Sequence, residues 1–220
     1  MLKEYLTVYQ RGEASFEEKK SRFISHVKPI DKEEEAIELI EQLKTRYWDA
    51  SHHVYAYDVH QESVIQRFSD DGEPHGTAGL PIIELIKKMG LANLVVVVIR
   101  YFGGTMLGTA GLIKAYGKSA TLGIEEAMLV KKILCSRVDV RVDYRMGGKI
   151  QNFALNKGHH ISHTNYAEDV EFEFILPYSD AETFVQEIIE QSNDNALIEI
   201  RGKEFILFDL ENKRLTAETK

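Results

Sequence analysis

The chain has 220 residues, of which 44% are hydrophobic and 28% charged, a composition typical of globular protein. Its formal net charge is −8, and residues 1–130 (15 Lys and Arg, 19 Asp and Glu) and 131–220 (12 and 16) are both acidic. This charge argues against broad binding to duplex DNA, which depends on many phosphate contacts, although a local basic patch is compatible with it. No apolar run approaches the roughly 18 residues of a membrane span, and the N-terminus lacks the order of a secretory signal. The single cysteine, Cys135, cannot form an internal disulfide. Together these features predict a cytoplasmic protein without membrane contact.

The first 130 residues show the hydrophobic patterns of a mixed α/β domain. A wholly apolar stretch, 94–99, is typical of a central strand buried on both faces. Asp31 and Glu34 have the spacing of a capping box that would begin a helix. The remaining expected elements are strands at 5–9 and 21–27 around a polar turn at 11–14, strands at 53–59 and 64–68, a helix from Pro81 to Gly90, and a helix that begins near Thr109.

The second half has the order β-α-β-β-α-β of a ferredoxin-like split unit. The expected elements are strands around 138–142, 159–166, 170–176 and 197–210, with helices at 148–157 and behind a second capping box at 179–182. We therefore predict an α+β protein with an N-terminal domain at 1–130, a C-terminal domain at 131–210 and a polar tail at 211–220.

The segment from Ser69 to Pro81 places three carboxylates, a histidine, three glycines and two prolines in thirteen positions. In one interpretation, Asp70, Asp71 and Glu73 bind a cation or a basic partner, and the backbone N–H groups of 76–79 bind an anion. In the other, the segment is a tight turn whose carboxylates cap neighbouring N–H groups. The residue types alone leave both interpretations open.

A second glycine-rich segment, from Arg100 to Gly111, joins a buried strand to the start of a helix. This order presents free N–H groups and a positive dipole to a phosphate or carboxylate, and Arg100 and Lys114 would add charge. The spacing matches neither a Walker A loop nor the Gly-x-Gly-x-x-Gly fingerprint. The alternative is close backbone packing, which Gly117 and Gly123 in the same helix also indicate.

The histidines do not suggest a metal site. His52 and His53 are adjacent on a predicted strand, so their side chains point to opposite faces. No nucleophile–base pair is evident, so we assign no catalytic residue and expect neither a metal nor a cofactor.

The two glycine-rich segments resemble those of the IMPACT family, in particular its bacterial YigZ-like branch. The matching residues are Ser69-Asp70-Asp71-Gly72-Glu73-Pro74, Gly76-Thr77-Ala78-Gly79, Arg100-Tyr101-Phe102-Gly103-Gly104, Leu107-Gly108, Gly111-Leu112, Ala115-Tyr116, Lys20-Ser21-Arg22-Phe23-Ile24 and Ala50-Ser51-His52. The resemblance implies that residues 1–130 adopt the ribosomal protein S5 domain 2-like fold, a four-stranded sheet with helices on one face. It further implies a C-terminal ferredoxin-like domain similar to that of elongation factor G.

Eukaryotic members of this family act on translation by binding the activator of a starvation-responsive kinase. For the bacterial branch the resemblance implies a translation-linked or nucleic-acid-binding role. Our leading hypothesis is a non-enzymatic regulator that binds RNA, the ribosome or a translation-regulatory protein. The alternatives are an enzyme or sensor of a small anionic ligand, such as a nucleotide or phosphate, and a protein–protein adaptor.

The residues expected to form the binding surface belong to the two glycine-rich segments and to the shorter motifs beside them. They are Arg22, His52, Asp70, Asp71, Glu73, Gly76, Thr77, Gly79, Arg100, Tyr101, Gly103, Gly104, Gly108, Thr109, Gly111 and Lys114.

Overall fold

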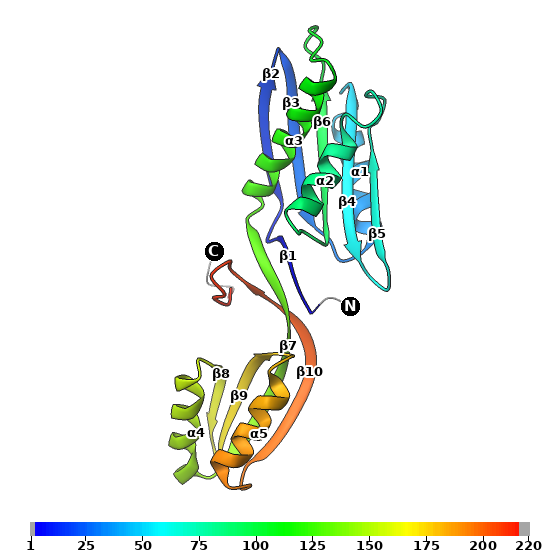
Figure 1. The fold of residues 1–220 in the computed structure, drawn as a ribbon. Helices are drawn as coiled ribbons and strands as arrows, with labels where there is room; N and C mark the ends of the chain where they lie inside the picture. Colours follow the sequence, from blue (N-terminus) through cyan, green and yellow to red (C-terminus); the bar gives the residue numbers. More distant parts are fainter. Residues whose placement is uncertain (1–2, 216–220) are drawn as a thin grey trace. The chain divides into compact units, whose positions relative to one another are not determined.

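The computed structural model describes residues 3–215, which form two compact units (Figure 1). Of the described residues, the first unit contains those up to Lys132 together with 208–213, and the second contains 133–207 together with 214–215. Both units combine a sheet with helices, so the predicted α+β class is confirmed.

The first unit is built on a five-stranded sheet with the order β2-β3-β6-β4-β5, in which every neighbouring pair is antiparallel. Its strands are β2 (Gly12–Glu18), β3 (Ser21–Pro29), β4 (His52–His60), β5 (Val64–Ser69) and β6 (Leu94–Tyr101). The first predicted strand is also present, as β1 (Glu4–Val8), but it pairs with β7 (Leu129–Val142) and not within this sheet.

The resemblance implies a four-stranded sheet, and the sheet here has five strands, because β2 forms where a polar turn was predicted at 11–14. The chain reverses instead at Lys19 and Lys20, whose φ angles are 47° and 67°. Positive φ at both central residues is the requirement of a type I′ hairpin turn, which usually selects Asn-Gly or Asp-Gly. Two lysines carry no such signal, so the hairpin could not be recognised in the sequence.

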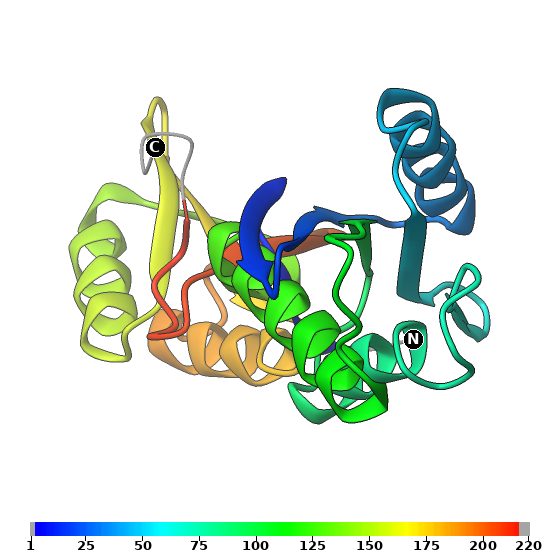
Figure 2. The same ribbon diagram turned by 90° about the horizontal axis from the view of Figure 1, so that it is seen from above.

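Helices cover both faces of this sheet, which corrects the expectation of helices on one face (Figure 2). α2 (Gly79–Lys88) and α3 (Thr109–Glu126) pack against the face that carries Phe23 and Val96, whereas α1 (Glu33–Arg46) packs against the face that carries Ile24 and Val97. Alternate side chains of a strand point to opposite faces, so a wholly apolar strand needs cover on both. The prediction that 94–99 is a central strand buried on both faces is confirmed.

The second unit has the predicted β-α-β-β-α-β order, with the sheet order β10-β7-β9-β8. After β7 its elements are α4 (Tyr144–Asn156), β8 (His160–Tyr166), β9 (Val170–Pro177), α5 (Ala181–Ser192) and β10 (Leu197–Phe208). Val138, Phe172 and Phe174 of the sheet and Phe184 of α5 share one apolar core. The predicted polar tail begins with a turn, in which the Asp209 carboxylate accepts the N–H group of Lys213 at 2.7 Å, and residues 216–220 lie outside the described residues.

The helix starts differ from those expected. The N-cap of α1 is Lys32 and that of α5 is Asp180, and neither makes a side-chain capping hydrogen bond. α4 begins before the predicted residue 148, because Asp143 caps it by accepting the N–H group of Met146 at 2.9 Å. Burial of an apolar face, more than a capping motif, therefore positions α1 and α5.

Two glycines of α3 allow a matched test of its packing. A Cβ atom at Gly123 would lie 2.6 Å from Ser25 Oγ, whereas one at Gly117 meets nothing within 4 Å. We expect Gly123→Ala to lower the free energy of unfolding by roughly 1–3 kcal/mol through overpacking against β3. Gly117→Ala should raise it by up to about 1 kcal/mol, because alanine favours the helix. Urea denaturation measures both, and equal effects would contradict this packing.

Candidate functional site

Both glycine-rich segments lie at one end of the first unit's sheet. Antiparallel pairing places His52, at the start of β4, opposite Arg100 near the end of β6, and Arg22 of β3 opposite Tyr101. We call this region the loop end; it comprises residues 19–22, 47–52, 69–79 and 100–114. The fold therefore brings together the residues that the sequence analysis assigned to one surface.

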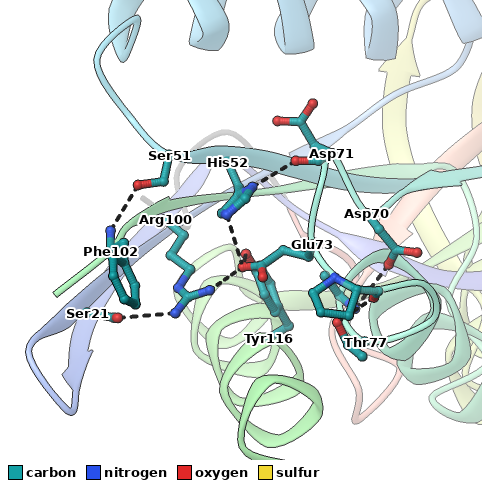
Figure 3. A network of polar contacts seen from close by, with 12 residues as sticks. Ser21, Ser51, His52, Asp70, Asp71, Glu73, Thr77, Arg100, Phe102 and Tyr116 are labelled. Atoms are coloured by element: carbon teal, nitrogen blue, oxygen red, sulfur yellow. Dashed lines mark hydrogen bonds and ion pairs between the residues drawn. The ribbon is translucent and has the colours of Figure 1, made fainter. Parts of the chain in front are cut away.

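A buried ion pair joins the two segments (Figure 3). Arg100 is only 4% exposed, and its Nη1 donates to Glu73 Oε1 at 2.5 Å. The same oxygen accepts the hydroxyl of Tyr116 on α3 at 2.8 Å. Burial, together with the negative charge of Glu73, raises the pKa of Tyr116, so its hydroxyl keeps the proton that it donates. Arg100, expected to face an anionic ligand, is thus neutralised inside the protein.

The Arg100 guanidinium also contacts β3 and two aromatic rings. Its Nη2 donates to Ser21 Oγ at 3.3 Å, and its carbon lies 5.4 Å from the Phe23 ring centroid and 5.5 Å from that of Phe102. Because one side chain contacts β3, the 69–81 segment and the β6–α3 loop, it fixes their positions relative to one another.

His52 and His53 point to opposite faces, as the alternation predicts. His52 Nδ1 donates to the backbone oxygen of Asp71 at 2.8 Å, and its Nε2 lies 3.7 Å from Glu73 Oε1. His53 Nε2 donates to the backbone oxygen of Tyr47, at the end of α1, at 3.0 Å. His52 forms an ion pair with Glu73 only when both of its ring nitrogens carry protons.

The carboxylate of Asp70 caps its own loop. Its Oδ1 accepts the N–H groups of Ala78 and Gly79 at 3.1 and 2.9 Å, and its Oδ2 accepts that of Gly76 at 2.8 Å. The N–H group of Thr77 donates to the Pro74 oxygen at 3.1 Å. The N–H groups proposed to hold an anion are therefore used within the loop. This geometry favours the structural interpretation of the 76–79 segment.

The three carboxylates of the segment have separate partners. Asp70 caps the loop, Asp71 Oδ2 accepts the N–H group of His53 at 2.6 Å, and Glu73 pairs with Arg100. Among residues 3–215, no group of three or more His, Cys, Asp or Glu side chains is arranged to hold a metal ion.

The second segment combines close packing with an open helix start. A Cβ atom at Gly103 would lie 2.0 Å from the backbone carbon of Lys20, so only glycine fits there. Gly108, with φ 73°, is the N-cap of α3, whose first turn includes Thr109 and Gly111 and has neither a capping side chain nor an acidic residue. Gly104 has φ 79°. Both interpretations of this segment thus describe part of it: packing at Gly103, and uncapped N–H groups at the helix start.

The loop end also exposes apolar side chains that the sequence analysis missed. Trp48 is 81% exposed, Met106 85% and Phe102 50%. Their segments are joined, because the Tyr101 hydroxyl donates to Asp49 at 2.8 Å and the Phe102 N–H group donates to Ser51 Oγ at 3.0 Å. A sequence does not reveal that a lone tryptophan is exposed, so no pattern pointed to these residues.

Cationic side chains lie in the same region. Lys20, Arg22 and Lys114 are exposed, and in the part of the chain that the structure describes they form no ion pair. The loop end thus combines positive charge with exposed rings.

Comparisons with known proteins identify the family. The Impact N-terminal domain matches residues 19–124, and the domain of unknown function DUF1949 matches residues 140–195. The IMPACT family member YvyE of Bacillus subtilis is 39% identical over 193 residues, which are 88% of this chain and 89% of that relative. The chain belongs to the IMPACT family. The predicted resemblance is confirmed.

Two further comparisons cover much of the chain. YigZ of Escherichia coli is 36% identical over 128 residues, 57% of this chain and 63% of its own length. A crystal structure of a hypothetical protein superimposes with a TM-score of 0.58 at 28% identity, covering 93% of this chain and all of the other. Within the described residues, this IMPACT family member has no helix long and apolar enough to cross a membrane.

The buried ion pair gives a stability prediction. Replacing Arg100 with leucine leaves the charge of Glu73 buried without its main partner, so Arg100→Leu should lower the free energy of unfolding by about 3–5 kcal/mol. The double variant Arg100→Leu/Glu73→Leu removes both charges and should recover much of this loss. Urea denaturation of the three proteins tests the prediction. A double variant less stable than Arg100→Leu would contradict it.

Proposed function

We propose that this IMPACT family member is a non-enzymatic regulator of translation that binds single-stranded RNA, including exposed strands on the ribosome, through the loop end. The observation that carries the proposal is the grouping of exposed Trp48, Phe102 and Met106 with Lys20 and Arg22 at one end of the sheet.

These residue types suit an unpaired strand. Stacking of a base on an aromatic ring contributes about 1–3 kcal/mol and tolerates any base, while cations beside the rings attract the phosphates. The uncapped N-terminus of α3 supplies further N–H groups with a positive dipole. The chain is acidic overall, which disfavours broad binding to duplexes.

The polar groups beside this surface favour binding over catalysis. Glu73, Arg100 and Tyr116 are buried, and Arg100 and Tyr116 both donate to Glu73 Oε1. Ser21 Oγ accepts hydrogen bonds from Arg100 and from the N–H group of Gly103. A general base or nucleophile must reach a substrate to act. These residues instead shape the segments that carry the exposed rings. Membership of a family whose eukaryotic members act on translation also supports a regulatory role.

Substitutions at the exposed rings should weaken RNA binding. We expect Trp48→Ala and Phe102→Ala each to raise the Kd for a fluorescent single-stranded RNA by roughly 5- to 100-fold, because each removes a stacking contact. Ile37→Ala, which truncates a half-exposed residue of α1, is the matched control and should change little. Fluorescence anisotropy at low salt gives the affinities.

A charge substitution tests the phosphate contacts separately. Lys20→Gln should weaken binding and reduce the slope of log K against log salt by about 0.7, because one released counterion is lost. Lys87→Gln, at the end of α2, serves as its control. No association with RNA or ribosomes at low salt would refute the proposal. In a pull-down, a protein partner that is still captured after nuclease treatment, but not captured by Trp48→Ala, would assign the surface to protein binding instead.

A further inference from the structure

The first unit has a hollow on the face of the sheet that α1 covers. It has a volume of about 360 Å³ and lies between α1 and the strands β2 and β3. The buried Arg100–Glu73–Tyr116 network lies toward α3, on the other face, since Tyr116 is a residue of α3. Ligand sites usually measure about 300–1,000 Å³, so the hollow has room for a small molecule.

The lining of this hollow is locally basic. Arg11, Lys28 and Arg46 come from three different segments of the chain, whereas Glu13 is the single carboxylate in the lining. The lining carries three positive charges and one negative charge, a net +2, although residues 1–130 carry 15 cationic and 19 anionic side chains, a net −4. Lys28 Nζ also lies 3.6 Å from Glu35 Oε2, a carboxylate outside the lining with which a ligand anion would compete. Cations from separate segments that converge in an acidic unit point to an anionic ligand.

Glu13 occupies the position that suits such an anion. Its Oε2 lies 3.4 Å from His26 Nδ1 and 3.9 Å from Arg46 Nη1, yet the side chain is half exposed. His26 is 8% exposed, and its Nε2 lies 3.2 Å from the Tyr47 hydroxyl. A ligand anion can therefore replace the Glu13 carboxylate beside these groups, while Glu13 turns toward solvent.

Two leucines add apolar surface to the lining of the hollow. Leu39 and Leu43 of α1 line it, and the Arg46 guanidinium lies over the Tyr47 ring, 5.0 Å from the ring centroid. Apolar side chains beside cationic ones suit a molecule with one flat or apolar part and one anionic group.

We propose that this hollow binds a small phosphorylated molecule, with its phosphate held by Arg11, Lys28 and Arg46 and its other part against Leu39 and Leu43. Arginine matches the geometry of phosphate oxygens, and Lys28 adds a point charge. This site is separate from the loop end, so either proposal can fail without the other.

The test uses the full chain, with ATP and inorganic pyrophosphate as probes, in the absence of divalent cations. We expect saturable NMR shifts at the His26 ring and at the amides of residues 11–13 and 26–28, with ATP bound more tightly than pyrophosphate. Arg46→Gln should raise the Kd about tenfold, as expected for loss of one charged hydrogen-bonded contact. Arg67→Gln, an exposed arginine on β5, is the matched control and should leave the Kd unchanged.

A second variant should bind the probes more tightly, a result that partial unfolding cannot produce. Glu13→Gln removes the competing carboxylate and should lower the Kd several-fold. An unchanged or higher Kd in Glu13→Gln, or shifts located at residues 109–112 instead, would overturn the proposal. The proposal would also be overturned if single-stranded RNA caused NMR shifts at the hollow while ATP and pyrophosphate caused none. The hollow would then belong to the nucleic-acid surface.

Discussion

The buried ion pair between Arg100 and Glu73 is the constraint on which the loop end depends. A charge removed from water is costly unless it is paired and hydrogen-bonded, so each side chain fixes the other. Glu73 belongs to the 69–81 segment and Arg100 lies near the end of the central strand β6. Tyr116 and Ser21 attach the pair to α3 and β3. Ordering a glycine-rich loop costs much conformational entropy, and these contacts help to offset that cost.

The two glycine-rich segments thus contain both buried residues that fix the loops, such as Glu73 and Arg100, and exposed residues of the proposed binding surface, such as Phe102. The second unit differs: the sheet face away from its helices carries Arg137, Asp139 and Arg141 of β7, and Arg137 and Arg141 pair with Glu173 and Glu171 of β9. RNA-binding sheets of this kind usually expose aromatic rings for stacking. This contrast supports assigning RNA binding to the first unit.

Much of the fold could be predicted because periodicity records burial directly. The apolar run of β6 and the alternation along β7 identified a central strand and a one-sided strand. The site was harder to predict, because residue types that bind ligands also stabilise loops. Asp70 accepts backbone N–H groups of its own loop, and Arg100 pairs with Glu73. Exposure of Trp48 depends on tertiary packing, which a single sequence does not record.

The turn at Lys19 and Lys20 has a thermodynamic consequence for the whole first unit. Left-handed backbone costs an L-residue with a Cβ atom roughly 1–2 kcal/mol, and asparagine followed by glycine would relieve most of it. The native chain instead keeps two positive charges at this hairpin. At this turn the protein therefore gives up folding stability and keeps charge beside its exposed rings, a compromise that fits the proposed binding surface.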